Sequence, residues 1–161
     1  MERWKKLVVV GVLLALAGLF YPLYRYFYIN GLRAEARVML TYLFTLEQVY
    51  RTDAGHYAYF AEPYGANRQG QSSCQQPEGA KTLGFYLRWC HEKEAGREPV
   101  LYAYRVDPKP DQPDGYTAQA ESGTDETGAS FICFGEGERD VWRIDEKKNL
   151  VHTQACTNSG P

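Results

Sequence analysis

Several kinds of chemistry leave no signature in this chain. The 161 residues include three histidines, His56, His91 and His152, which are scattered along the sequence. There is no glycine-rich phosphate loop, no HExxH motif and no nucleophile elbow of the G-x-S-x-G type. Because no convergent set of acid, base and nucleophile stands out, the sequence does not predict an enzyme. No cofactor is indicated either.

A large excess of charge of one sign is also missing. Eighteen lysines and arginines stand against 20 aspartates and glutamates, which gives a formal net charge of −2. That balance does not indicate nucleic acid as a partner. The length suits one domain plus an anchor better than two full domains.

Motifs for metal binding are weak. The acidic residues Glu136, Glu138 and Asp140 alternate with other residues after Gly135, and calcium needs several oxygen ligands. The stretch lacks a DxDxDG pattern, so we interpret it as a solvated loop. No metal site is predicted.

The four cysteines form no CxxC pair of the kind that zinc sites usually contain. Their number is even, and all four follow the apolar segment described below. We therefore expect two disulfides in an oxidising compartment, with reduced core cysteines in a cytosolic domain as the alternative. Three pairings are possible, of which the simplest is local: Cys74 with Cys90, and Cys133 with Cys156.

One long apolar run is present, from Leu7 to Tyr24, without a charged residue. Eighteen residues are about the threshold for a membrane-spanning helix. Arg3, Lys5 and Lys6 precede the run, and basic residues hold that end of a span in the cytoplasm. We expect residues 1–6 in the cytoplasm, residues 7–28 in the inner membrane, and the rest in the periplasm. The side chains expected to serve the membrane or assembly helix are Leu7, Val10, Leu14, Ala17, Phe20, Pro22 and Tyr24.

A cleaved signal peptide is the main alternative for this segment. Ala15 and Ala17 resemble a cleavage triplet, but they lie inside the apolar run. The residues from Tyr21 to Tyr28 include bulky aromatics, which suit a membrane interface and are poor substrates for signal peptidase. The sequence therefore favours a retained anchor.

Residues 29–52 continue as an amphipathic helix. Apolar residues recur there at spacings of three and four, which predicts one buried face, and charged residues such as Glu47 are placed mostly off it. A membrane helix and a separate core helix joined at Asn30–Gly31 would be the alternative. The residues expected to pack on a sheet are Ala36, Leu40, Leu43, Leu46 and Tyr50.

Residues 53–161 are expected to form a globular domain. A loop region at 53–80 and a short helix or turn at 81–91 precede the strands, and residues 107–115, with three prolines, form a further loop. Short alternating segments rich in strand formers predict strands at 100–106, 116–121, 130–134, 140–144 and 150–153. A long helix followed by consecutive strands indicates an α+β fold with an antiparallel β-meander.

Five phrases in the C-terminal part occur in a recognisable order: LEQVYRTDAGHYA, LGF, LYAYRV, YTAQAESG and DVWRIDEKKNLV. Together with the apolar run ending in Pro22 and Tyr24, their order and spacing resemble type IV pilins. The likeness is closest in style to deltaproteobacterial pilins and covers nearly the whole chain. The glycine–aromatic–acid signature of the family is absent, and Glu2 is the nearest carboxylate to the run. Either the sequence is not the full precursor, or a pilin-like protein remains in the membrane.

The resemblance implies a pilin-like α+β subunit without catalytic activity. It further implies a C-terminal disulfide at Cys133 and Cys156, and partners that are copies of the chain, other pilins, and the pilus assembly machinery. The expected function is a structural subunit of a type IV pilus or of a related secretion system. The alternative is a membrane-anchored periplasmic module that binds or senses a ligand through the loop region at 53–80.

Overall fold

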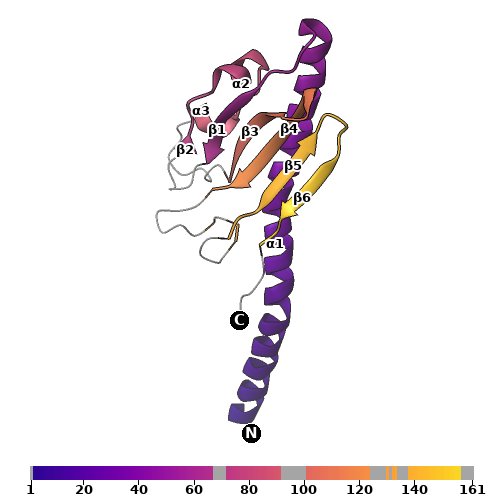
Figure 1. Cartoon of the computed structure of the whole chain (residues 1–161). Helices are drawn as coiled ribbons and strands as arrows, with labels where there is room; N and C mark the ends of the chain where they lie inside the picture. Colours follow the sequence, from indigo (N-terminus) through magenta and orange to yellow (C-terminus); the bar gives the residue numbers. More distant parts are fainter. Residues whose placement is uncertain are drawn as a thin grey trace. The chain divides into compact units, whose positions relative to one another are not determined.

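The computed structural model describes residues 2–66, 72–91, 101–123, 130, 132–133 and 138–156 (Figure 1). The chain divides into two units, Met1–Arg33 and Ala34–Pro161, called here the N-terminal unit and the C-terminal unit. The elements, in chain order, are α1 (Glu2–Ala54), β1 (Phe60–Ala66), β2 (Ser72–Ser73), α2 (Glu78–Thr82), α3 (Arg88–His91), β3 (Tyr102–Lys109), β4 (Gln112–Ser122), β5 (Val141–Asp145) and β6 (Leu150–Gln154).

The helix α1 runs without interruption from Glu2 to Ala54. It continues through Pro22 and through Asn30–Gly31, so the alternative of two helices joined at that pair is wrong. The helix ends at Ala54, and the next residue, Gly55, adopts a φ of +79° and donates its N–H to the carbonyl oxygen of Arg51 at 2.9 Å. A glycine in the left-handed conformation is the common way to end a helix, because it has no Cβ to clash with the backbone.

The C-terminal unit contains one six-stranded sheet with the order β2-β1-β3-β4-β5-β6. Every neighbouring pair of strands is antiparallel. The four strands from β3 to β6 follow one another both in the sheet and in the chain, which is the predicted meander. The second half of α1 packs against this sheet (Figure 1), and the α+β prediction is confirmed.

The strand β1 lies inside the region that the sequence predicts to be a loop. Phe60 and Tyr64 are buried on it, and its pairing with β3 shifts register between these two residues. The shift accommodates Pro63, because a proline is tolerated in a sheet where the hydrogen-bond ladder is irregular. The sequence FAEPYGA was not predicted to be a strand because it contains a proline and a glycine.

Two further predictions about strands need correction. The expected loop at 107–115 is mostly strand, because β3 continues to Lys109 and β4 begins at Gln112. The expected strand at 130–134 is wrong for the residues that the structure describes there. Ser130, Ile132 and Cys133 lie outside the six strands.

The core of the C-terminal unit lies between α1 and one face of the sheet. Ala36, Leu40 and Leu43 are fully buried, as predicted, whereas Leu46 and Tyr50 are half-buried. Glu47 was expected off this face, but its exposed fraction is 0%. The helical period explains the correction, because positions 36, 40, 43 and 47 fall on the same side of an α-helix. The largest fully buried side chains of the sheet are Tyr64, Tyr102, Tyr104, Tyr116, Val106 and Ile144.

Candidate functional site

The N-terminal unit carries a dense set of exposed apolar side chains. Among the residues predicted for a membrane or assembly helix, Val10, Phe20, Pro22 and Tyr24 are exposed. The side chains of Leu7, Leu14 and Ala17 lie outside the described part of the chain. Large apolar side chains that are each 45–72% exposed between residues 9 and 28 are Val9, Val10, Val12, Leu16, Leu19, Phe20, Tyr21, Leu23, Tyr24, Tyr26, Phe27 and Tyr28.

These side chains surround the helix instead of forming one stripe, since runs such as 19–21 and 26–28 are exposed at every position. A helix that is apolar all round is normally covered, either by other helices or by lipid. Measured over the part of the chain that the structure describes, no helix meets the length and hydropathy that a membrane crossing requires.

Aromatic rings cluster at the end of this apolar segment. The rings of Tyr24 and Tyr28, one turn apart, have centroids 6.1 Å apart and are nearly parallel. Those of Tyr26 and Phe27 meet edge to face at 5.7 Å. Tyrosine combines an apolar ring with a polar hydroxyl, so such a group suits the boundary between an apolar and an aqueous environment.

A second notable cluster surrounds Asp140 in the C-terminal unit. Its carboxylate is fully buried and accepts three hydrogen bonds. The Tyr102 hydroxyl and Trp142 Nε1 donate to Oδ2 at 2.5 and 2.7 Å, and His152 Nε2 lies 2.8 Å from Oδ1. The interpretation of Asp140 as part of a solvated loop is therefore wrong. The carboxylate instead joins β3, β5 and β6.

The position of His152 follows from the sheet register. Trp142 and His152 are paired across β5 and β6, and their rings stack in parallel with centroids 4.0 Å apart. The Arg37 guanidinium of α1 lies 5.7 Å from the centroid of the Trp142 ring. The predicted strand at 140–144, which begins with Asp140, was the signal in the sequence. Its alternation could not show which strand would pair with it.

An Asp–His pair can orient an imidazole for base catalysis when a nucleophile contacts the other ring nitrogen. In the described ranges of the chain, no hydroxyl or thiol forms a hydrogen bond with Nδ1 of His152. The nearby Cys133 and Cys156 are joined in a disulfide. The geometry thus describes a hydrogen-bonded junction of three strands, without the parts of a catalytic triad.

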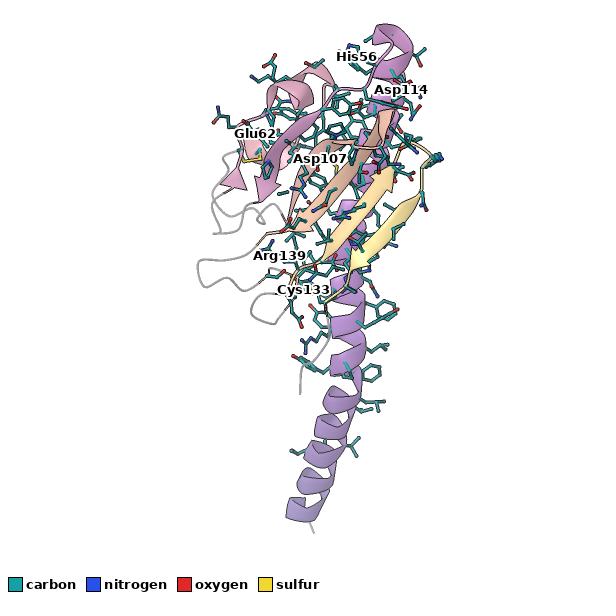
Figure 2. The ribbon with its side chains drawn as sticks, viewed as in Figure 1. His56, Glu62, Asp107, Asp114, Cys133 and Arg139 are labelled. Atoms are coloured by element: carbon teal, nitrogen blue, oxygen red, sulfur yellow. A yellow bond between two sulfur atoms is a disulfide. The ribbon has the colours of Figure 1, made fainter. Side chains whose placement is uncertain are left out.

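The structure contains two disulfides, as expected, and their pairing is the local one. Cys74 bonds to Cys90, and Cys133 bonds to Cys156. Figure 2 shows His56 beside the C-terminal end of α1. Cys133 lies at the other end of the sheet. The first disulfide links the residue after β2 to α3, and the second ties the chain beyond β6 to the segment before β5.

The loop region at 53–80, expected as the surface of a ligand-binding module, contains β1, β2 and the start of α2. Within the described residues, no group of three or more His, Cys, Asp or Glu side chains is arranged to hold a metal ion.

Comparison with known proteins gives no match. No family description, no curated protein and no solved structure resembles the chain at a significant level.

Proposed function

We propose that this protein is a structural subunit of a filament of the type IV pilus kind, or of a related secretion system. In this proposal the N-terminal unit is anchored in the inner membrane by a single pass, with its start in the cytoplasm. The C-terminal unit stands in the periplasm, or outside the cell once assembled. Its partners are copies of itself or other pilins and the assembly machinery, and it performs no catalysis.

The observation that carries the proposal is the exposed apolar surface between Val9 and Tyr28. Each Å² of this apolar surface that stays in water is unfavourable by about 25 cal/mol relative to a buried one. Lipid, or the same segment of other copies, would cover it on all sides. The two disulfides agree with a C-terminal unit outside the cytoplasm, since disulfides persist in oxidising compartments.

A charged substitution in the apolar segment tests the proposal. Leu19 is 72% exposed, and we expect Leu19→Asp to reduce the membrane-bound and filament-bound fractions strongly. Aspartate at the centre of a spanning helix costs about 2.5–3.5 kcal/mol on insertion scales. The measurement is fractionation of the full chain after an alkaline wash, followed by mechanical shearing of filaments from intact cells.

Val38→Asp is the matched control, because Val38 is also exposed on α1 but lies in the C-terminal unit. It should leave the membrane fraction unchanged. Wild-type protein that is fully soluble would overturn the anchor. Wild-type protein that stays alone in the inner membrane, absent from sheared filaments, would overturn the filament role and favour the tethered ligand-binding module.

A further inference from the structure

Glu47 is a buried carboxyl group on the face of α1 that packs against the sheet. Its Oε2 accepts the N–H of Ala58 at 3.1 Å. Its Oε1 is buried as well and has no hydrogen-bond partner among the residues that the structure describes. A carboxylate in this setting has lost most of its water and gained one donor, which disfavours the charged form.

No nearby cation offsets this burial through a direct contact with Glu47 in the described part of the chain. Arg51, one turn further along α1, donates to the Tyr57 hydroxyl at 2.7 Å, and its guanidinium lies 4.8 Å from the centroid of that ring. The titratable groups of the elements around Glu47 are Arg51 on α1, His56, Tyr57 and Tyr59 after it, Asp114 and Tyr116 on β4, and Glu146 after β5.

The electrostatics agree with the geometry. Burial raises the pKa of Glu47 from 4.5 to about 8, and the hydrogen bond from Ala58 opposes the rise only in part. Burial also raises the pKa of the Tyr116 hydroxyl, and the nearby Glu47 adds to that rise. Glu47 is therefore mostly a neutral acid at pH 7.

The segment 55–58 follows the end of α1 and contains Ala58, whose N–H donates to the Glu47 carboxyl. Gly55 begins the segment with a positive φ, and Tyr57 and Ala58 are buried. The segment ends at Tyr59, whose carbonyl oxygen lies so close to α2 that a Cβ on Gly79 would meet it at 2.2 Å. Beyond Tyr59 the chain is β1, which packs near α2 and pairs with β3, so a local opening would be confined to residues 55–58.

We propose that Glu47 is a proton-operated latch: the neutral acid holds segment 55–58 against α1, and ionisation releases this segment so that water reaches the carboxylate. The latch is a property of the C-terminal unit and is independent of filament assembly.

The direction of the pH dependence follows from linkage. The folded chain binds the Glu47 proton more tightly than the unfolded or opened chain does, so the stabilisation is complete below pH 4.5. It is lost progressively as the pH rises from about 4.5 to about 8, and it does not change further above that value. Over this window the equilibrium constant for opening rises by up to about tenfold for each pH unit.

Hydrogen exchange of the full chain in detergent between pH 5 and pH 9 tests the latch. After correction for base-catalysed exchange, the protection of amides 55–58 should fall with rising pH in the wild type. Glu47→Gln still offers an oxygen to Ala58 N–H but cannot ionise, so its protection should be independent of pH. Glu62→Gln, at an exposed position on β1 (Figure 2), should behave like the wild type.

An equal pH dependence in Glu47→Gln and in the wild type would overturn the latch, as would a wild type whose protection does not change. If the glutamine variant fails to fold, carbon-13 NMR of the wild-type Glu47 carboxyl gives the answer. A midpoint near 8 supports the latch, whereas a midpoint at the ordinary value of 4.5 overturns it.

Discussion

At the scale of single residues, two buried carboxyl groups differ in their hydrogen-bond partners. Asp140 has donors on both oxygens, from Tyr102, Trp142 and His152. Glu47 has one donor, on one oxygen. Hydrogen bonds to a buried carboxylate compensate its loss of water, and Glu47 receives fewer of them than Asp140 does.

We expect Asp140→Ala to lower the free energy of unfolding by about 3–5 kcal/mol, because the buried Tyr102 hydroxyl and the half-buried Trp142 and His152 side chains lose their acceptor. Tyr102→Phe should cost about 1–2 kcal/mol, since it removes one donor and leaves two others in place. Urea denaturation of the full chain measures both changes.

Asp107→Ala is the control for the loss of a carboxylate. Asp107 is half-exposed and forms an ion pair with Arg105 at 3.2 Å, so this change should cost less than about 1 kcal/mol. A cost for Asp140→Ala that is no greater than that of the control would show that the cluster contributes little to stability.

At the scale of elements, α1 changes its role along its length. In the N-terminal unit the large apolar side chains between Val9 and Tyr28 that the structure describes are exposed, and in the C-terminal unit one face of α1 is buried. Spacings of three and four predicted that face correctly at Ala36, Leu40 and Leu43. The prediction failed at Glu47 because a charged residue is rarely buried, so residue type was given more weight than position.

Truncation of one side chain on each face of α1 tests this division. Leu40 is fully buried, and Leu40→Ala should lower the free energy of unfolding by about 2–5 kcal/mol through lost burial and a residual cavity. Val38→Ala, at a position that is 64% exposed, should change it by less than about 0.5 kcal/mol. Similar costs at the two positions would mean that the assigned buried face is wrong.

At the scale of the whole molecule, the hydrophobic core and both disulfides lie in the C-terminal unit. The sheet, the second half of α1 and the Asp140 junction all belong to residues 34–161. The exposed apolar surface between Val9 and Tyr28 lies in the N-terminal unit. Under the proposed function, folding and assembly would thus belong to different parts of one chain.

We therefore expect a chain that begins at Ala34 to fold alone. It should form both disulfides and unfold cooperatively, because every described buried side chain of the core except Ile29 is retained. Its urea midpoint should be close to that of the full chain in detergent, and it should no longer sediment with membranes. A truncated chain without a cooperative transition would show that residues 1–33 contribute to the core.

The strands show how far local patterns reach. β3, β4, β5 and β6 were predicted because they alternate and contain aromatic and β-branched residues. β1 was missed, since Pro63 and Gly65 weaken its local preference and only pairing with β3 makes it a strand. Local propensity is a weak guide where a neighbouring strand supplies the hydrogen bonds.

By itself, the sequence determined the features that depend on neighbours along the chain. These are the apolar run of the first segment, the helical spacing at Ala36, Leu40 and Leu43, and the alternation of the last strands. The tertiary structure alone decided which distant groups meet: Asp140 with Tyr102 and His152, and Glu47 with Ala58. Periodicity expresses a preference of the local backbone. The burial, the hydrogen-bond partners and the protonation of a side chain depend on what packs against it. Those contacts form only when the sheet packs against the helix.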